Sequence, residues 1–386
     1  MRRKTHFLIG TRWFGVLGPC QLLIERLVEE GYDVFVFGQE DAHYARYDQG
    51  NARLIKINMA RSYLSPIRDI LDIIKLIAFV LWYKPDHIHS FNPKPALLSF
   101  MASLVRPRAK FFIGVTGLGN TFIRAKALEP FIRWTLRLAC LRASFVFFQN
   151  PDDVDLFRQK RLIAEDKIRM FIGPGVDLRV FTPKRFGANR RVVVSCTARL
   201  IWQKGIREYI EAARAILKRY PDRDIRFKLF GEIDHEHPDC IDPAFLEQAV
   251  REGVVQYISW TDDIAAELRA SDIFVLHSYR EGAPRAILEA SASCLPTIGS
   301  DAIGVRELIV DGVTGFLGPL KDIPALTGAL GRLIEDPQMR ADMGAAARRL
   351  IAEPLSLERA TQAQFQMYID ASNHWKGQKE WAEKDA

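Results

Sequence analysis

The strongest constraint on the fold is a repeated alternation between short apolar segments of strand length and longer segments with helical periodicity. Apolar residues fill positions 6–9, helical spacing follows at 21–30, and apolar residues return at 32–37. Two parallel strands need a crossover between them, and a helix is the usual crossover, so this alternation predicts βαβ units. Repeated units of this kind form a parallel, doubly wound α/β sheet.

The alternation continues and then starts afresh. Further strands are predicted at 53–57, 86–89, 110–115 and 145–148. A helix before residue 80 has its apolar residues on one face, namely Ile67, Ile70, Leu71, Ile74, Ile77 and Ala78. A basic stretch at 183–190 with Pro and Gly breaks the pattern. A second series follows, with strands at 191–195, 227–230, 255–258, 273–277 and 297–299 and helices near 204–219, 243–252, 263–270 and 284–293.

Two doubly wound domains are therefore predicted, at 1–182 and 183–356. A last amphipathic helix at 357–375 is predicted to cross back to the first domain, since Phe365, Met367 and Tyr368 can pack there. Ligands of open α/β sheets bind outside the carboxyl ends of the strands. We therefore expect the active site in a central cleft that the two domains face.

Composition agrees with a globular protein, since 48% of the 386 residues are hydrophobic and 26% are charged. The longest apolar run of the first half, 76–83, is far shorter than the ~18 residues that span a bilayer. Arg12 interrupts the apolar stretch after the basic start, which favours a mature cytosolic chain over one with a signal peptide. The five cysteines form no C-x-x-C pair, so we expect buried thiols and neither a disulfide framework nor a zinc site.

Charge divides unevenly along the chain. Residues 1–185 hold 29 Lys and Arg against 17 Asp and Glu, whereas residues 186–386 hold 25 against 30. A basic first half predicts an anionic partner, either nucleic acid or acidic lipid. No nucleic-acid-binding motif accompanies the charge, which favours lipid.

A predicted helix at 124–142 offers a place for such a lipid contact. Lys126, Arg133 and Arg137 fall on one of its faces with aromatic residues nearby, a pattern typical of helices that bind an anionic membrane surface. An ordinary surface helix is the alternative, because Arg often covers apolar area on soluble proteins.

The segment 280–290 carries two carboxylates, Glu281 in a turn and Glu289 in the helix that follows Pro284. Gly282 allows the backbone to approach a ligand closely, and Pro284 suits the first turn of a helix. The amino end of a helix offers N–H groups to a polar or anionic group. We therefore expect a ligand to contact Gly282, Ala283 and Pro284.

The segment 197–205 carries two cations after the first strand of the second domain. Arg199 lies in the predicted loop and Lys204 at the start of the next helix. Two cations with the N–H groups of a helix are an arrangement that binds a diphosphate. The alternative is that both side chains are ordinary solvated surface residues.

With these segments, nearly the whole chain resembles glycosyltransferase family 4, the retaining enzymes of the GT-B fold. The matching segments, in order, are 173–177 with 181–183, 198–200 with 204–205, 270–276, the E-x7-E segment from Glu281 to Glu289, and 311–317. The resemblance implies transfer of a sugar from a nucleotide-diphosphate donor, a UDP-sugar, with retention and without a metal or cofactor. It also implies that Arg199, Lys204 and Glu281 are the catalytic residues and that Glu289 binds the nucleotide ribose.

Two loops of the first domain, at 87–95 and 115–122, look like those of a subgroup that builds bacterial surface polysaccharides. The acceptor in that subgroup is often a lipid-diphosphate-linked saccharide. We expect Gly15, His89, Thr116 and Gly117 at the acceptor or in the cleft. Many relatives have His where Thr116 stands, so His89 is the nearest imidazole candidate, and a structural histidine is the equal alternative.

The combined prediction is a glycosyltransferase bound peripherally to the inner face of the plasma membrane. A nucleotide-sugar epimerase of the same architecture and a non-catalytic nucleotide-sugar-binding protein are the alternatives, because fold alone does not separate them. A possible D-x-D motif at 152–155 opens a predicted helix of the first domain, where its carboxylates match the helix dipole.

Overall fold

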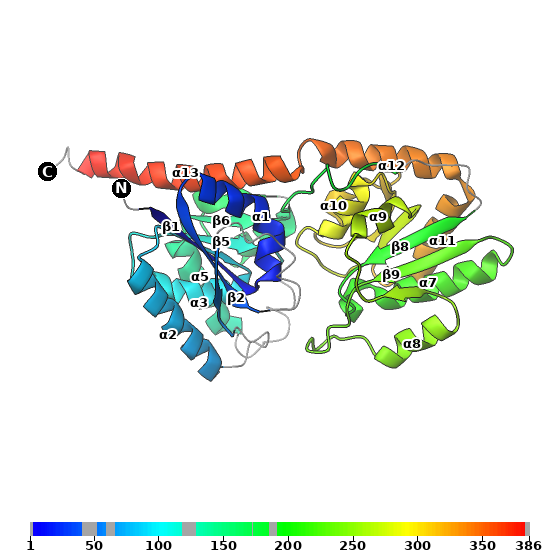
Figure 1. Ribbon diagram of the computed structural model, residues 1–386, viewed down its shortest axis with the longest axis horizontal. Coiled ribbons are helices and arrows are strands. Elements are labelled where there is room, and N and C mark those ends of the chain that lie inside the picture. Colours follow the sequence, from blue (N-terminus) through cyan, green and yellow to red (C-terminus); the bar gives the residue numbers. More distant parts are fainter. Residues whose placement is uncertain are drawn as a thin grey trace. The chain divides into compact units, whose positions relative to one another are not determined.

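The computed structural model describes residues 3–40, 52–58, 66–117, 129–171, 173–184 and 191–382. The chain divides into two compact units, Met1–Pro174 with Glu358–Ala386, and Gly175–Leu357. Each unit is a parallel sheet covered by helices, which confirms the two doubly wound domains (Figure 1).

The division falls after Pro174 rather than at residue 182. Val176 forms a backbone bridge with Ser356, and Phe181 is buried in a core cluster of the second unit. Residues 175–182 therefore belong to the second unit, although the loss of apolar periodicity comes only after them.

The described strands of the first unit form a seven-stranded parallel sheet in the order β3-β2-β1-β4-β5-β6-β7. The strands are β1 (Lys4–Arg12), β2 (Tyr32–Gln39), β3 (Arg53–Lys56), β4 (His87–Phe91), β5 (Lys110–Val115), β6 (Phe145–Phe148) and β7 (Ile168–Met170). The helices are α1 (Phe14–Glu29), α2 (Pro66–Tyr83), α3 (Pro93–Ser103), α5 (Glu129–Arg142), α6 (Pro151–Gln159) and the last helix α13 (Leu357–Ala382). The strand order reverses between β1 and β4, which is where sheets of this kind bind ligands.

Helix α13 returns to the first unit as predicted, and it is longer than expected. Phe365, Tyr368 and Ala371 are buried in one apolar cluster with α1 and the sheet. The guanidinium of Arg26 lies over the Phe365 ring, 5.5 Å from its centroid.

The side of helix α2 that is buried differs from the apolar face that the sequence pattern predicts. Leu76 and Val80 are buried in the core, and Ile73 and Ile77 pack against it. Of the residues assigned to one apolar face, only Ile77 belongs to this buried side. The others, Ile67, Ile70, Leu71, Ile74 and Ala78, are exposed.

Helix α5 begins at Glu129, and residues 118–128 lie outside the described part of the chain. Lys126 therefore lies outside the described residues. Arg133 and Arg137 are both exposed on α5. No helix of the described residues is long and apolar enough to span a bilayer.

The second unit holds a six-stranded parallel sheet in the order β10-β9-β8-β11-β12-β13 among its described residues. The strands are β8 (Val192–Thr197), β9 (Ile225–Phe230), β10 (Gln256–Ile258), β11 (Ile273–Leu276), β12 (Thr297–Ser300) and β13 (Gly315–Gly318). The helices are α7 (Ile206–Arg219), α8 (Pro243–Arg251), α9 (Ile264–Arg269), α10 (Arg285–Ala292), α11 (Ile323–Glu335) and α12 (Pro337–Ala352). All five cysteines are free, but Cys240 and Cys294 are only half-buried, which corrects the expectation that every thiol is buried.

Three histidines form a buried cluster under α13. The Nδ1 atoms of His6 and His87 are 3.3 Å apart, and His87 Nε2 lies 3.2 Å from the Ser372 hydroxyl. His89 Nδ1 lies 2.5 Å from the Tyr368 hydroxyl. Burial lowers the pKa of all three imidazoles, to about 3 for His87 and His89. The cluster is therefore neutral near pH 7 and joins the sheet to α13.

This cluster predicts a loss of stability in mild acid. The unfolded chain binds protons at these histidines below about pH 6.5, whereas the native state resists protonation down to about pH 3 for His87 and His89. The free energy of unfolding should therefore fall as pH drops from 6.5 towards 3, by about 1.4 kcal/mol per histidine at pH 5.5. Urea unfolding at pH 7.5, 6.5 and 5.5 measures it.

His87→Asn should reduce this pH dependence, because it removes one of the groups that titrates. The exposed His235 supplies the matched control, and His235→Asn should leave the dependence unchanged. Equal dependence in the wild type and His87→Asn would show that His87 does not couple pH to folding.

Candidate active site

The strand order of the second sheet reverses between β8 and β11, so a ligand is expected at the carboxyl ends of these two strands. The loop after β8 carries Arg199 and Lys204, and the loop after β11 carries Glu281. These are the three residues that the sequence analysis named as catalytic. The fold therefore places all three at the edge of the sheet where ligand binding is expected.

Lys204 and Glu281 are brought into direct contact across this edge. The Lys204 ammonium donates a hydrogen bond to Oε1 of Glu281, and both side chains are largely buried. A ligand at this point would meet a cation and an anion together. Such a pair can bind a phosphate oxygen through the ammonium and a hydroxyl through the carboxylate.

Hydrogen bonds join the two loops that carry this ion pair. The Gln203 carbonyl accepts hydrogen bonds from the Tyr279 backbone N–H at 2.9 Å and from the Ser278 hydroxyl at 3.1 Å. The Tyr279 hydroxyl donates to Glu208 Oε1 at 2.6 Å. Because Gln203 adjoins Lys204 and Tyr279 lies two residues before Glu281, these bonds hold the ion pair in position.

The sequence analysis missed Glu208 and Tyr279. Glu208 lies in the first turn of α7 and is almost fully buried. Burial and the Glu208 carboxylate raise the pKa of the Tyr279 hydroxyl, so it remains a hydrogen-bond donor at neutral pH. The signal available in the sequence was an acidic residue four positions after Lys204, on the helical face that also carries the core residues Tyr209, Ala212 and Ala213.

Gly205 is required by two features of this edge. Its φ of +72° is a left-handed conformation that other residues adopt at a cost. A Cβ at this position would lie 2.2 Å from the His277 carbonyl oxygen. The turn after β8 therefore lies so close to the end of β11 that only a glycine fits at position 205.

Arg199 has a different partner from Lys204. Its Nη1 lies 3.1 Å from Oδ2 of Asp234, a residue of the loop after β9, and about half of the Arg199 side chain is exposed. Arg199 is therefore paired with a largely buried carboxylate while much of its own side chain remains exposed.

The loop before α10 places the predicted donor-binding residues as follows. Gly282 and Pro284 are buried and Ala283 is half-buried. The helix begins at Arg285, so Pro284 is the N-cap residue rather than a residue of the first turn. Glu289 lies one turn after Arg285, whose Nη2 is 3.3 Å from Glu289 Oε1. Burial raises the pKa of the Glu289 carboxyl, and Arg285 opposes this shift.

In the first unit, Thr116 and Gly117 follow β5, and Gly15 is exposed at the start of α1. The Thr116 hydroxyl donates to Asn92 Oδ1 at 2.5 Å. Asn92 follows the neighbouring strand β4 and has a φ of +75°, and its N–H donates to the Gly114 carbonyl at 2.7 Å. The sequence analysis did not name Asn92 as a site residue, and its φ of +75° with a ψ of 157° is a strained backbone conformation for a residue other than glycine.

The position of His89 favours one of the two interpretations that the sequence left open. Its side chain is fully buried and its Nδ1 faces the Tyr368 hydroxyl of α13. The imidazole is therefore closed off from solvent in this structure. Of the two interpretations left open, the structural one agrees with the geometry.

The acidic segment 152–155 forms the start of helix α6. Asn150 caps α6 by accepting a hydrogen bond from the Asp153 N–H at 2.8 Å, and Asp152 and Asp153 lie in the first turn. Among the described residues, no group of three or more His, Cys, Asp and Glu side chains is arranged to hold a metal ion.

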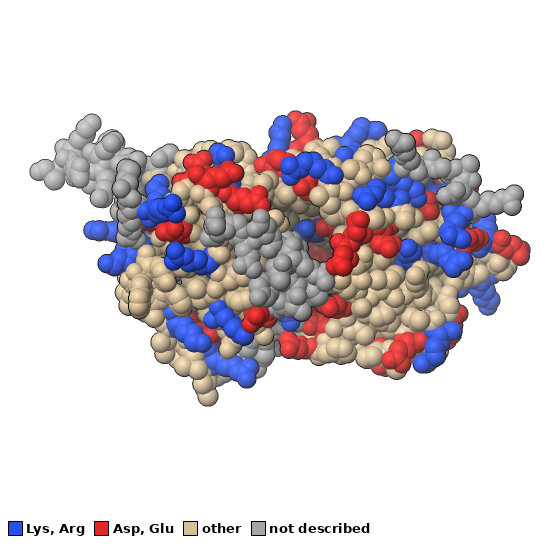
Figure 2. Space-filling view, viewed as in Figure 1, with Lys and Arg blue, Asp and Glu red and all other residues tan. Residues whose placement is uncertain are grey.

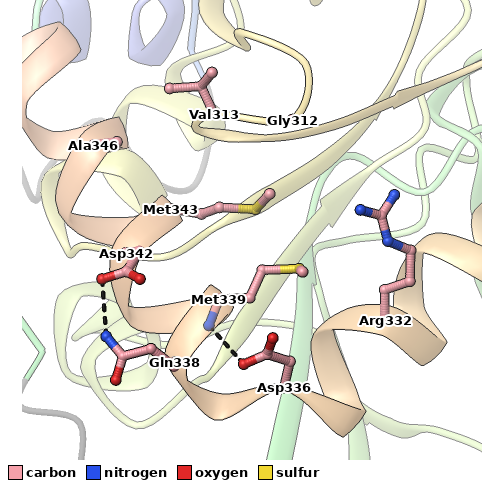
Figure 3. Close-up of a pocket in the computed structure, with 9 residues that line it drawn as sticks. All are labelled: Gly312, Val313, Arg332, Asp336, Gln338, Met339, Asp342, Met343 and Ala346. Carbon is pink, nitrogen blue, oxygen red and sulfur yellow. Dashed lines mark hydrogen bonds between the residues drawn. The ribbon is translucent and has the colours of Figure 1, made fainter.

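A cavity of about 520 Å³ lies elsewhere in the second unit (Figure 3). Its walls come from α11, α12 and the turn at Gly312 and Val313 that precedes β13. Met339 and Met343 line it, and Gln338 donates a hydrogen bond to Asp342 at its rim. None of the candidate residues lines this cavity. The turn that lines it lies at the amino end of β13, whereas ligands of such sheets bind at the carboxyl ends of the strands.

Comparison with known proteins identifies the class. Residues 182–350 match the family model for glycosyl transferases group 1, and residues 20–180 match the model for Glycosyltransferase Family 4. The structure aligns with that of HepE from Anabaena in complex with UDP, with a TM-score of 0.75 and 19% identity over 95% of this chain and 100% of that chain. The fold and the family models together define a glycosyltransferase of the GT-B fold.

Within this class, the chain belongs to glycosyltransferase family 4. It is 26% identical to N,N'-diacetylbacillosaminyl-diphospho-undecaprenol alpha-1,3-N-acetylgalactosaminyltransferase of Campylobacter jejuni, over 83% of this chain and 87% of the relative. It is also 26% identical to UDP-Gal:alpha-D-GlcNAc-diphosphoundecaprenol alpha-1,3-galactosyltransferase of Escherichia coli, over 90% and 91%.

The close approach at Gly205 predicts that Gly205→Ala destabilises the second unit. The left-handed conformation alone should cost about 1–3 kcal/mol, and the contact with the His277 carbonyl adds to it. Gly328→Ala is the matched control, because Gly328 is an exposed residue of α11 whose added Cβ meets no atom within 4 Å. It should leave stability unchanged or raise it by about 0.5–1 kcal/mol.

Thermal and urea unfolding of both variants test this prediction. Gly205→Ala with wild-type stability would show that the turn after β8 can move away from β11 without loss.

Proposed function

We propose that this protein is a retaining, metal-independent glycosyltransferase that moves a sugar from a UDP-sugar to a lipid-diphosphate-linked saccharide in bacterial surface glycan synthesis. The observation that carries the proposal is the Lys204–Glu281 pair at the carboxyl ends of β8 and β11. Two relatives aligned over most of their length are named for transfer to undecaprenyl-diphosphate-linked saccharides, and this supports the acceptor class.

The second domain binds the donor in this proposal. Lys204 contacts the diphosphate, and Arg199 exchanges Asp234 for a phosphate oxygen. Glu281, released from Lys204, accepts a hydrogen bond from a hydroxyl of the donor sugar. Glu289 binds the ribose, and the loop of Gly282, Ala283 and Pro284 presents backbone groups to the donor.

In the reaction, the bond between the anomeric carbon and the diphosphate oxygen breaks, and its electron pair remains on that oxygen. Retention requires the acceptor hydroxyl to bond to the face that the diphosphate leaves. The hydroxyl proton can then pass to the departing diphosphate oxygen beside it. Lys204 and Arg199 stabilise the negative charge that develops there, which is the task of a metal ion in other transferases.

The first domain binds the acceptor. Thr116, Gly117 and Gly15 lie at the ends of strands or starts of helices, where a saccharide hydroxyl can reach them, and Asn92 orients the Thr116 hydroxyl. The exposed Arg133 and Arg137, with the basic charge of the first half, support peripheral binding to an anionic membrane on its cytoplasmic face. No nucleic acid is a partner in this proposal.

Incubation with a panel of UDP-sugars and undecaprenyl-diphosphate-linked saccharides tests the activity, with the anomeric configuration of the product read by NMR. The proposal expects an extended lipid-linked product whose new bond keeps the configuration of the donor. Conversion of the donor without any acceptor would support the epimerase instead, and binding without conversion would support a non-catalytic protein.

Loss of either cation should slow turnover more than it weakens donor binding. Removing one preorganised contact to developing charge typically reduces the rate ~10²–10³-fold, so Lys204→Ala and Arg199→Ala should have this effect on kcat. Glu281→Gln should have a similar effect, whereas Glu289→Gln should act mainly on donor affinity, because the ribose is remote from the breaking bond.

Steady-state kinetics and calorimetric titration with UDP separate turnover from binding. Lys218→Ala is the matched control, since Lys218 is an exposed lysine near the other end of α7. Near-normal kcat in a folded Lys204→Ala variant would contradict the proposed role of the ammonium.

The metal-independent mechanism predicts that EDTA leaves the activity unchanged. Lys204 and Arg199 supply the positive charge at the diphosphate, so chelation removes nothing that the reaction needs. Initial rates with and without EDTA, measured with a detergent-solubilised acceptor, give the answer. Inhibition by EDTA that Mg²⁺ or Mn²⁺ reverses would contradict the mechanism and leave the family assignment intact.

A further inference from the structure

Helix α2 exposes a continuous stripe of large apolar side chains. Ile67, Ile70, Leu71, Ile74, Leu81 and Trp82 are all more than half exposed. At 100° per residue these six positions, with the exposed Ala78 between Ile74 and Leu81, fall on one side of the helix over its whole length. Single exposed apolar residues are ordinary, whereas a continuous stripe of this size marks an interaction site.

The neighbouring helices extend this surface. Helix α3 packs against both α2 and α5. Met101, Leu104 and Val105 are exposed at the end of α3, and Phe131, Trp134 and Leu141 are exposed on α5. Most of the large exposed apolar side chains among the described residues therefore belong to this one group of helices.

The charges of α2 are divided between its two sides. Asp69 pairs with the buried Lys94 at 2.9 Å, and Asp72 is almost fully buried, so both carboxylates point into the domain. Arg68 and Lys75 are exposed beside the apolar stripe. On α5, Arg133 and Arg137 are exposed in the same way. In Figure 2, the surface over α2 at the lower left is mainly tan and is flanked by blue side chains.

We infer that the apolar stripe of α2, with the exposed ends of α3 and α5, is the surface by which the protein inserts into an anionic lipid bilayer. This inference rests on the proposed function, since it names how the enzyme reaches a membrane-bound acceptor. Apolar side chains enter the acyl boundary and cations meet the anionic headgroups. Trp82, which is 83% exposed, suits the headgroup level, where Trp is enriched.

A second copy of the chain or another protein would use the apolar stripe but would not need its flanking charge. Only cations flank the stripe on α2, and this complementarity to anionic headgroups favours the bilayer. Helix α2 contains four charged residues. This charge suits a helix that lies in the plane of the membrane surface and does not span the bilayer.

Flotation of the full chain with phosphatidylglycerol vesicles tests the surface, with phosphatidylcholine vesicles as the neutral comparison. Ile70→Glu/Ile74→Glu should reduce binding to anionic vesicles at least tenfold. Val250→Glu/Leu350→Glu is the matched control, because it places the same charges on exposed apolar positions of α8 and α12 in the other domain. Unchanged binding by the α2 variant would overturn the inference, and so would a stripe-dependent dimer that forms without vesicles.

Fluorescence quenching by brominated lipids gives a second readout that does not depend on the Glu substitutions. Trp82→Phe should remove a large share of the quenching, whereas Trp260→Phe, in the second domain, should leave it unchanged. Equal quenching in wild type and Trp82→Phe would show that α2 does not enter the bilayer.

Transfer to a short-chain acceptor that needs no membrane separates this inference from the proposed function. The α2 variant should keep wild-type activity on that acceptor and lose activity on vesicles that contain the long-chain acceptor. Loss of both activities in a folded variant would overturn the docking role. An enzyme inactive on every acceptor that still binds vesicles through α2 would contradict the proposed function alone.

Discussion

The close contact between the turn after β8 and the end of β11 is the constraint on which the candidate site depends. Gly205 allows the turn to approach the His277 carbonyl, and the Gln203 carbonyl then accepts two hydrogen bonds from the β11 loop. Lys204 lies between these two residues, so its ammonium is directed at Glu281. The ion pair is thus a consequence of backbone packing at the point where the strand order reverses.

The first domain depends on a different interaction, the one that joins its sheet to α13. Three neutral histidines, the Tyr368 hydroxyl and the Ser372 hydroxyl form this junction in a buried, apolar setting. Burial keeps the imidazoles uncharged near pH 7, because a charged form would lose its hydration without gaining a carboxylate partner. A segment from the far end of the sequence therefore belongs to the first domain.

Helix α2 shows how one element can serve two environments. Its buried side packs into the core through Leu76 and Val80, and its other side is equally apolar but exposed. A helix with apolar residues on two sides is normally covered on both of them. In this chain, one side is covered by the domain, and the proposed bilayer contact would cover the other.

The sequence by itself determined the βα alternation, the two doubly wound domains, the return of α13 and the loops that carry Arg199, Lys204 and Glu281. Those features depend on periodicity and on residue types next to strand ends, which are local properties of the chain. Only the tertiary structure decided that His89 is buried under Tyr368, that Glu208 and Tyr279 hold the site, and which side of α2 is exposed. Each of these depends on contacts between residues distant in sequence. A run of apolar residues has the same periodicity whether it faces a core or solvent, so the sequence pattern does not reveal which side is buried.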